Sequence, residues 1–433
     1  MTPSTRAVRT GLIACCYLAV LMPASVAGER RGPLKDLPSK PQGVHLARIK
    51  ALGDNSWADL GSAAPDPKWG KACGRSWSPV AAFAPDLRGA FFFGEGPHGM
   101  VKPDGHYMDD LWFYDINQHR WICVYPGIRA KGGYEQVKIN AEGFEVGPDG
   151  HPLPIAQVGH AYCAVTYDVH RRAFMSQPTF QHYWKKAIKG RQEVLVAHKD
   201  KLVDKSLTSP WVYDTVGGHW DRFKTRNKRA VCGSGAVLVY VPSVRKAFGY
   251  ERWTSRMAWY DPGKRDWTEI KPKGDRTPWY MDVNSCYDSR RDRIYLGGGL
   301  WAKPKVEEGE SALWMFDVRT ETFSRLEPKV NPTPTSYATN RAMMFYDSVN
   351  DAVLLFYHKP SKGRTRTIFA YHPGRNEWEV VAEDPKELHK KGNTTWMGFY
   401  DPDLNAHVMH AACDGRPNGI VRVYRYKREI AKK

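Results

Sequence analysis

The sequence lacks the cysteine spacings that would indicate a metal-binding or thiol-redox domain. Only eight of its 433 residues are cysteines, no two of them form a C-x-x-C pair, and none has the spacing of a zinc-ligand set. Helical heptads are also absent, which excludes a coiled coil. No nucleic-acid-binding motif is present, so we expect no nucleic-acid partner. Fold and function must therefore be inferred from apolar segments and turns.

Long apolar runs are rare too, and the clearest one lies at the N-terminus. Residues 1–27 combine a basic start (Arg6 and Arg9), an apolar segment (11–22) and small residues before Gly28. This pattern is typical of a secretory signal peptide, and the apolar segment is short for a membrane anchor. We therefore expect an exported protein, periplasmic, on the cell surface or extracellular, whose mature chain has no transmembrane anchor.

Acidic residues are too few to balance the basic ones. The formal charge is +18, and removing Arg6 and Arg9 with the signal peptide leaves +16. One interpretation is a generally basic surface. The other is attraction to an anionic partner, such as an acidic polysaccharide or a bacterial envelope.

A hairpin frame recurs along the chain. In this frame an aromatic or apolar residue precedes an Asp, a short polar turn follows, and an aromatic residue stands six positions after the Asp. In the last copy His372 takes the place of the Asp. The copies are FYDINQHRW (113–121), VYDTVGGHW (212–220), WYDPGKRDW (259–267), MFDVRTETF (315–323) and AYHPGRNEW (370–378). Each predicts two strands joined by a tight turn.

A second hairpin frame precedes each of these copies and also occurs once more near the C-terminus. It consists of an apolar run, a brief polar turn and another apolar run, at residues 80–96, 161–175, 235–250, 283–299, 341–358 and 397–415. Two hairpins per unit make four strands, and four-stranded units repeated along a chain are typical of a β-propeller.

The last unit is incomplete, because residues 419–433 supply a third strand and no fourth. The segment ALGDNSWADLG (51–61), with Trp57 as an unassigned aromatic marker, precedes the first unit. We therefore predict an all-β, six-bladed propeller over residues 51–433, closed by an N-terminal strand that completes the last blade. Residues 28–50 form an N-terminal extension. Insertions are expected at about 127–158, as one hairpin, and 178–208.

The paired hairpins resemble kelch repeats, as found in kelch propellers and in the central domain of galactose oxidase. The resemblance covers residues 73–433 and is carried by Gly159-His160, by Gly297-Gly298-Gly299 and by the Tyr/Phe-Asp-x5-Trp hairpins. It implies a propeller of four-stranded kelch-like blades. Galactose oxidase-like enzymes bind copper through two histidines and two tyrosines, one of them bonded to a cysteine. HAYC (160–163) has these residue types, but no Tyr-His pair stands where such a site requires it.

Loop lengths indicate where a binding site would lie. Turns inside the hairpins are short, whereas the connections between hairpins vary widely, and in a four-stranded blade the two kinds emerge on opposite faces. Loops on a rigid scaffold are where binding residues collect. The candidate binding residues are His160, Tyr280, Asp282, Asn340, Arg341, Asn393 and Trp396 near the channel mouth, and Trp184, Lys185 and Lys186 in the second insertion.

Each candidate group has a structural alternative. For the mouth residues, the alternative is that they do no more than form hydrogen bonds with the strand ends and with water in the channel. For residues 182–205, the alternative to a docking arm for an anionic ligand is a helix that caps the rim. His407, His410 and Cys413 are discounted as metal ligands, because strand positions 407 and 410 point to opposite faces. We expect the strongest positive potential on the variable face, through Lys185, Lys186, Lys189, Lys362, Arg364 and Arg366.

Two cysteines bracket the expected seam of the ring. Cys73 lies between the N-terminal closing strand and the first strand of unit one, and Cys413 ends the second strand of unit six. Units six and one are neighbours in a six-bladed ring, so a disulfide between these cysteines is expected in an oxidising compartment. The alternative is that both are thiols. Cys163, Cys232 and Cys286 lie in apolar strand context, where buried thiols are expected.

Two classes of function remain. The first is a non-enzymatic binding module, expected to be a monomer without a cofactor, whose loop-rich face engages a carbohydrate or a protein. The second is a carbohydrate-active enzyme, either a galactose oxidase-like copper oxidase or a lyase that uses mouth residues such as His160, Tyr280 and Arg341. Copper is expected only under this alternative.

Overall fold

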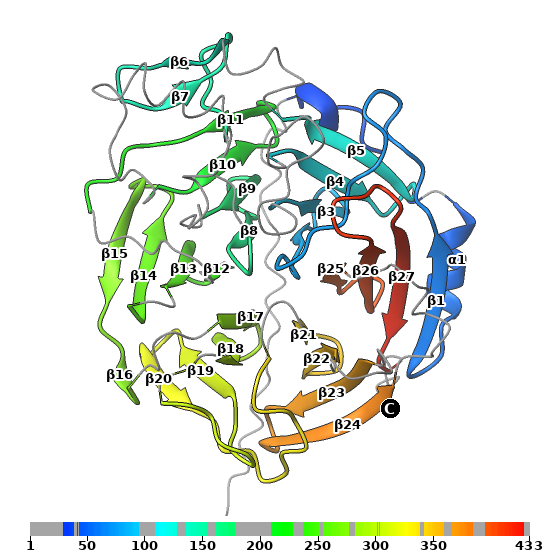
Figure 1. Cartoon of the computed structure of the whole chain (residues 1–433), viewed down its shortest axis with the longest axis vertical. Coiled ribbons are helices and arrows are strands. Elements are labelled where there is room, and N and C mark those ends of the chain that lie inside the picture. Colours follow the sequence, from blue (N-terminus) through cyan, green and yellow to red (C-terminus); the bar gives the residue numbers. More distant parts are fainter. Residues whose placement is uncertain are drawn as a thin grey trace, which may run out of the picture.

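Over the residues that the structure describes, six four-stranded antiparallel sheets surround a central axis as the blades of a β-propeller (Figure 1). This arrangement confirms the predicted all-β, six-bladed fold. The computed structural model describes residues 29–38, 41, 43–94, 109–127, 136–154, 161–177, 209–227, 237–251, 254–276, 282–300, 302, 304–337, 342–358, 366–383 and 395–427. The signal peptide predicted at 1–27 and the insertion predicted at 178–208 lie outside them.

Each of the first five blades is built in chain order, with its first strand nearest the axis (Figure 1). Blades one to three comprise β2 (Ala82–Ala84), β3 (Gly89–Phe92), β4 (Leu111–Asp115) and β5 (Arg120–Tyr125); β8 (Val165–Asp168), β9 (Ala173–Ser176), β10 (Trp211–Asp214) and β11 (His219–Asp221); and β12 (Val237–Val241), β13 (Lys246–Glu251), β14 (Arg256–Asp261) and β15 (Asp266–Ile270).

Blades four and five follow the same plan. They comprise β17 (Asp282–Asp288), β18 (Arg293–Leu300), β19 (Leu313–Asp317) and β20 (Thr322–Arg325); and β21 (Ala342–Asp347), β22 (Ala352–His358), β23 (Arg366–His372) and β24 (Glu377–Glu383). A short strand, β16 (Lys273–Gly274), extends blade four by pairing parallel to β20.

Blade six joins the two ends of the chain. It contains β25 (Thr395–Asp401), β26 (Ala406–Ala412) and β27 (Ile420–Arg425), and its outermost strand is β1 (Ser56–Gly61). Trp57 of β1 stands opposite Tyr424 of β27, with ring centroids 4.9 Å apart. The N-terminal strand therefore completes the last blade, as the sequence predicts, and supplies the fourth strand that the C-terminal unit lacks.

The predicted N-terminal extension contains two short helices, η1 (Gly32–Leu34) and α1 (Val44–Ala51). Leu46 and Ile49 of α1 are buried in a cluster shared with blades one and six. Within the described part of the chain, no helix has the length and apolar character needed to cross a membrane.

The first insertion forms a single hairpin of β6 (Lys138–Ile139) and β7 (Glu145–Val146). Its apolar residues Val137 and Leu153 are buried in the cluster that fills blades one and two. The hairpin is therefore packed onto the rim beside β11 (Figure 1).

The recurring Tyr/Phe-Asp-x5-Trp frame has a direct structural explanation. Its two aromatic positions face each other across strands three and four of a blade. The pairs are Tyr114 and Trp121, Tyr213 and Trp220, Tyr260 and Trp267, Phe316 and Phe323, and Tyr371 and Trp378. In the first pair the ring centroids are 5.4 Å apart and tilted by 59°. Such cross-strand aromatic pairs stabilise a hairpin by up to about 1 kcal/mol each.

The Asp of the frame fixes the turn that follows it. Oδ1 of Asp115 accepts hydrogen bonds from the backbone N–H groups of Asn117 (2.9 Å) and Gln118. The turn then ends at His119 with a φ of 51°, a left-handed conformation that polar residues such as His and Asn adopt more readily than branched ones. The same capping recurs at Asp168, Asp261, Asp288, Asp347 and Asp401. The Asp therefore specifies the tight turn between paired strands.

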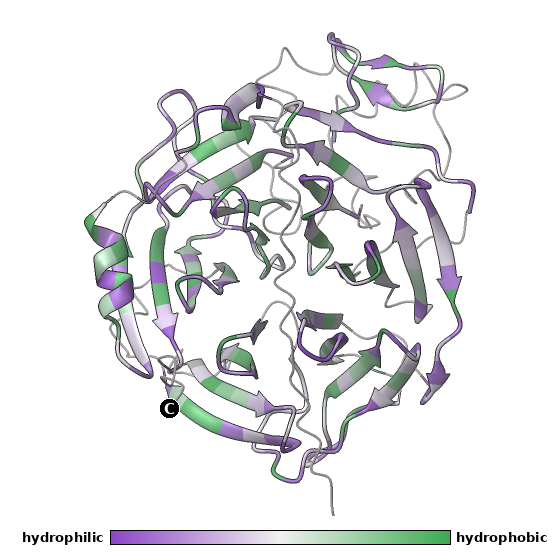
Figure 2. Cartoon of the chain, turned by 180° about the vertical axis from the view of Figure 1, so that it is seen from behind, coloured by the Kyte–Doolittle hydropathy of each residue, from purple (hydrophilic) through white to green (hydrophobic). Residues whose placement is uncertain are grey.

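Aromatic contacts also join neighbouring blades. Phe91 of blade one stacks on Tyr167 of blade two, and Phe83 of blade one stacks on Phe399 of blade six with centroids 5.3 Å apart. Cys163 and Cys286 are buried, as expected from their apolar context. Hydrophobic colouring is concentrated on the strands and hydrophilic colouring on the turns (Figure 2). The hydrophobic core thus lies between the blades, and functional residues have to be sought at the strand ends and the rim.

Candidate functional site

The topology separates two faces of the propeller. The turns between strands one and two, and between strands three and four, emerge on one face. Most of these turns are four residues long, such as 116–119, and we call this face the short-turn face. Connections between strands two and three, and between blades, emerge on the opposite, loop-rich face. They range from 252–255 in blade three to 177–210 in blade two.

Most of the binding residues expected from the sequence lie outside the described residues. These are His160, Tyr280, Asn340, Arg341, Asn393, Trp184, Lys185 and Lys186. Asp282 is the first residue of β17, where its backbone pairs with Leu300, and Trp396 is the second residue of β25. Both therefore stand where an innermost strand begins at the loop-rich face, as the alignment of units predicts.

The side chain of Trp396 packs between blades five and six. It is 8% exposed and belongs to an apolar cluster with Met409 and Tyr424. The Arg422 guanidinium lies 5.6 Å from its ring centroid, a cation–π contact. This environment explains why an aromatic residue is needed here, and a role for Trp396 in ligand binding stays a prediction.

The seam between blades six and one does bring the two cysteine-bearing segments together. Gly74 forms a parallel bridge with Asp414, its N–H donates to the carbonyl of Arg416, and the N–H of Gly415 donates back to Gly74. The expected disulfide is not formed, because Cys73 and Cys413 are both thiols in this structure. The Cys413 sulfur instead accepts a hydrogen bond from Asn418 Nδ2 at 3.0 Å, and backbone pairing already joins the segments.

A buried ion pair lies at the same seam. The Arg75 side chain is 1% exposed, and its Nη2 lies 2.9 Å from Asp110 Oδ1. Its Nη1 donates to the carbonyl oxygen of Gly94. Gly94 and Asp110 flank the connection between β3 and β4, so Arg75 ties together the two ends of that connection. A buried pair of this kind costs several kcal/mol when one partner is removed.

Two titratable residues near Arg75 have shifted pKa values. Burial, reinforced by the charge of Arg75, lowers the pKa of His410 to about 3, and this imidazole packs against the rings of Phe92 and Trp121. Burial raises the pKa of Asp414, whose Oδ1 accepts from the backbone N–H of Ser76 at 3.0 Å. His410 is therefore neutral at physiological pH, and the arrangement anchors the loops at the seam.

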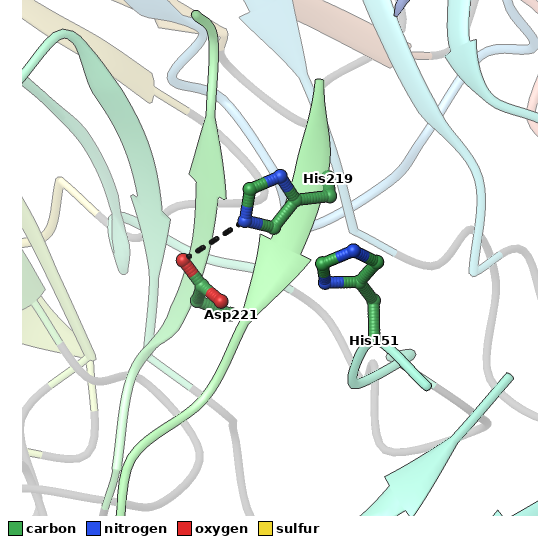
Figure 3. A group of neighbouring side chains, drawn as sticks. All are labelled: His151, His219 and Asp221. Carbon is green, nitrogen blue, oxygen red and sulfur yellow. Dashed lines mark ion pairs between the residues drawn. The ribbon is translucent and has the colours of Figure 1, made fainter. Parts of the chain in front are cut away.

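A separate group of polar side chains lies on the rim at blade two, and sequence reasoning missed it. His151 of the first insertion faces His219 and Asp221 of β11 (Figure 3). One ligand atom from each residue lies within 4.8 Å of the other two. His219 and Asp221 are two residues apart on a strand and so point to the same side, which is the one sequence signal that could have identified them. The approach of His151 depends on how the insertion folds.

Comparison with known proteins supplies no family for the chain. No family model matches it, and no curated protein matches it. Among solved structures, it is similar to the GH74 xyloglucanase from Xanthomonas campestris, with 11% sequence identity and a TM-score of 0.44. The match covers 87% of this chain and 56% of that protein, so the chain spans little more than half of its length. A similarity this distant carries no argument about activity.

Proposed function

We propose that this chain is an exported, kelch-like propeller that acts as a binding module and engages an anionic polysaccharide through its loop-rich face. The observation that carries the proposal is the asymmetry of the two faces. The short-turn face is fixed by capped turns, whereas the loop-rich face carries the long connections, and Arg75 anchors the ends of one of them. A rigid scaffold with long loops on one face is typical of proteins that bind through those loops.

The kelch-like character is supported by the glycines that end the second strand of blade four. Gly299 has a φ of 107°, and a Cβ there would collide with the carbonyl oxygen of Thr335. A Cβ at Gly297 would meet the ring of Tyr337 at 2.6 Å. Both positions therefore require glycine, as expected for a repeat that carries a glycine motif at this point of the blade.

The anionic character of the ligand is supported by charge. The net formal charge is +18, and the connections between β9 and β10 and between β22 and β23 are rich in basic residues. Those singled out from the sequence are Lys185, Lys186, Lys189, Lys362, Arg364 and Arg366. Clustered basic side chains attract polyanions over distances comparable to the Debye length.

Binding of the mature protein to polygalacturonate, with a neutral galactomannan as the comparison, tests the proposal. We expect retention on polygalacturonate that falls steeply as sodium chloride is raised, because screening weakens exposed charge pairs. The triple variant K185A/K186A/K189A should bind more weakly. The matched control is K264A/R319A/R375A, which removes three exposed basic residues from the short-turn face and should bind like the wild type.

Three results would contradict the proposal. Retention could be independent of salt, the loop variant could bind like the wild type, or the short-turn control could lose binding equally. Incubation of the protein with each polysaccharide, followed by assays for new reducing ends, unsaturated products and hydrogen peroxide, separates binding from catalysis. We expect none of these products.

A further inference from the structure

The rim group has the donor atoms of a transition-metal site. It consists of the two imidazoles of His151 and His219 and the carboxylate of Asp221, all partly exposed (Figure 3). Two histidines and one carboxylate, with the fourth position open to water, form one of the established ligand sets for zinc in proteins. The group lies at the outer edge of blade two, where His219 and Asp221 are on β11 and His151 is in the connection between blades one and two.

The separation of the donor atoms fits such a site. His219 Nε2 lies 3.4 Å from Asp221 Oδ2. Two ligands at about 2.0–2.1 Å from a tetrahedral zinc ion are about 3.3–3.4 Å apart, so this pair already has the spacing of a tetrahedral edge. The same distance is long for a direct N–H···O hydrogen bond, whose donor and acceptor are typically about 2.9–3.0 Å apart.

The third ligand is presented by an ordered turn. The His151 N–H donates to Asp149 Oδ1 at 3.1 Å, and the His151 carbonyl accepts from the N–H of Gly147 at 2.9 Å. Its ring lies against that of His219, with centroids 4.1 Å apart and planes tilted by 31°. Its ligand atom lies within 4.8 Å of the other two, so a movement of roughly 1–1.5 Å gives the spacing of a tetrahedral edge.

We propose that His151, His219 and Asp221 bind one divalent transition-metal ion, with zinc the ion best suited to the donor set, and that the ion fastens the first insertion to the outermost strand of blade two. β11 spans only three residues and, among the strands that the structure describes, pairs with β10 alone. A metal that joins β11 to residue 151 cross-links two segments far apart in the sequence. It therefore stabilises the native rim, because the three ligands are not brought together in the unfolded chain.

The experiment uses the untagged mature protein, treated with a chelator and titrated with zinc chloride by isothermal calorimetry. We expect one ion per chain and a rise in melting temperature on zinc addition. Cobalt(II), added in place of zinc, should give a visible absorption band of tetrahedral character. H151Q, H219Q and D221N should each weaken zinc binding by at least about tenfold, since each removes a ligand.

The matched control is H372Q. His372 Nε2 lies 3.2 Å from Glu379 Oε1, so this pair resembles that of His219 and Asp221, but over the described residues it has no third ligand close enough to complete a site. H372Q should bind zinc like the wild type. Circular dichroism in the absence of metal checks that the variants fold. Zinc should also protect His151 and His219 of the wild-type protein from diethyl pyrocarbonate, a readout that needs no variant.

Each contrary result overturns the proposal. These are no saturable binding at one ion per chain, equal affinity of the wild type and H219Q, loss of binding in H372Q alone, or modification of His151 and His219 at the same rate with and without zinc. Retention of polysaccharide binding by H219Q would leave the proposed function intact while this site fails, so the two proposals are tested separately.

Discussion

The two faces of this propeller differ in how neighbouring blades are joined. On the short-turn face, polar side chains link each blade to the next around the whole ring. In order from the first pair of blades to the seam, the links are Arg172 to Asp86, His170 to Tyr240, Ser243 to Asp292, Arg291 to Asp351, Tyr400 to Asp347 and Arg88 to Asp401. On the loop-rich face, the Arg75–Asp110 pair instead ties the ends of one connection within blade one. Backbone contacts such as that of Gly74 with Asp414 also join blades on the loop-rich face, but the side-chain links that recur at every blade junction lie on the short-turn face.

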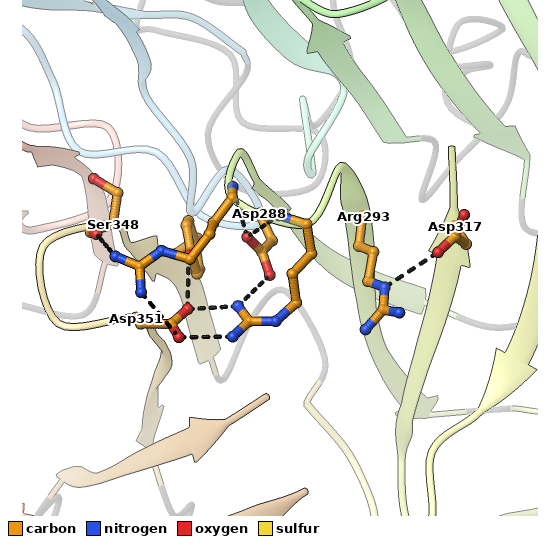
Figure 4. A network of polar contacts seen from close by, with 8 residues as sticks. Asp288, Arg293, Asp317, Ser348 and Asp351 are labelled. Carbon is orange, nitrogen blue, oxygen red and sulfur yellow. Dashed lines mark hydrogen bonds and ion pairs between the residues drawn. The ribbon is translucent and has the colours of Figure 1, made fainter. Parts of the chain in front are cut away.

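The link between blades four and five shows how such a contact is built (Figure 4). Arg291 forms a bidentate contact with Asp351, with distances of 2.5 Å from Nη1 to Oδ1 and 2.7 Å from Nη2 to Oδ2. Its Nη1 also donates a hydrogen bond to Asp288 Oδ2. Burial alone would raise the pKa of Asp351, but the hydrogen bonds from Arg291 and Tyr346 outweigh it and lower that pKa. Planar bidentate pairs of this kind are among the stronger ion pairs in proteins.

The largest effect is expected at Asp347, which combines turn capping with the link between blades. The buried carboxylate accepts from the backbone N–H of Asn350 (2.9 Å) and from Tyr400 OH (2.9 Å), and lies 3.5 Å from His407 Nε2. Asp347→Ala leaves these partners unsatisfied, so we expect a loss of about 3–5 kcal/mol in the free energy of unfolding. Denaturant unfolding followed by tryptophan fluorescence measures it. A loss below about 1 kcal/mol would show that the short-turn face does not hold the ring.

The part of this architecture that could be predicted from sequence is the local part. The turn at Asp347 is specified within a few residues, so its pattern recurs and reveals the blades. Trp57 could be assigned to the last blade because only one strand was missing. The links between blades have no such signature, since Arg88 and Asp401 meet only through the closed ring.

The candidate site was harder to predict for the same physical reason. His219 and Asp221 lie on one strand, but the third donor comes from an insertion whose packing depends on long-range contacts. The proximity of the segments that carry Cys73 and Cys413 was predictable from ring closure, whereas the orientation of the two thiols was not. Topology thus fixes which segments meet, and side-chain packing decides what they form.

The second prediction concerns Arg291, which sharpens the comparison within the short-turn face. Arg291→Ala should lower the free energy of unfolding at pH 7 by about 2–3 kcal/mol, because charge-assisted hydrogen bonds are lost at a half-buried site. The pKa of Asp351 is lowered in the folded protein. The contribution of Asp351 to the free energy of unfolding is therefore present above its unfolded-state pKa of about 3.9 and is lost as the pH falls through its folded-state pKa. The difference between the wild type and the variant should shrink below about pH 4, and a difference unchanged in acid would contradict this account.

The third prediction concerns His410, at the seam near the loop-rich face. Its folded pKa is about 3, whereas an unfolded histidine has a pKa of about 6.5. The unfolded state therefore binds more protons between these values, so stability is fully present above about pH 6.5 and is lost as the pH falls, by about 2 kcal/mol at pH 5. His410→Leu should remove that part of the pH dependence in urea unfolding at pH 7 and 5. His119, whose pKa burial also lowers to about 4, titrates in both proteins and cancels. If the free energy of unfolding of His410→Leu fell between pH 7 and pH 5 by as much as that of the wild type, His410 would not be the source of this pH dependence.

The smallest effect on stability, and the sharpest contrast between the faces, is expected at Lys305 in the connection between β18 and β19. Its side chain is 78% exposed and lies 3.4 Å from Glu307, itself 64% exposed. Solvent-exposed pairs of this kind contribute little, so Lys305→Glu should leave the denaturation midpoint unchanged. If the loop-rich face attracts polyanions, the same charge reversal should weaken retention on polygalacturonate at low salt. The weakening should disappear near 1 M salt, where the Debye length is only about 3 Å. Lys264→Glu makes the same change in a turn of the short-turn face and should alter neither quantity. An equal loss of retention in both variants would mean that the whole basic surface, and not one face, attracts the ligand.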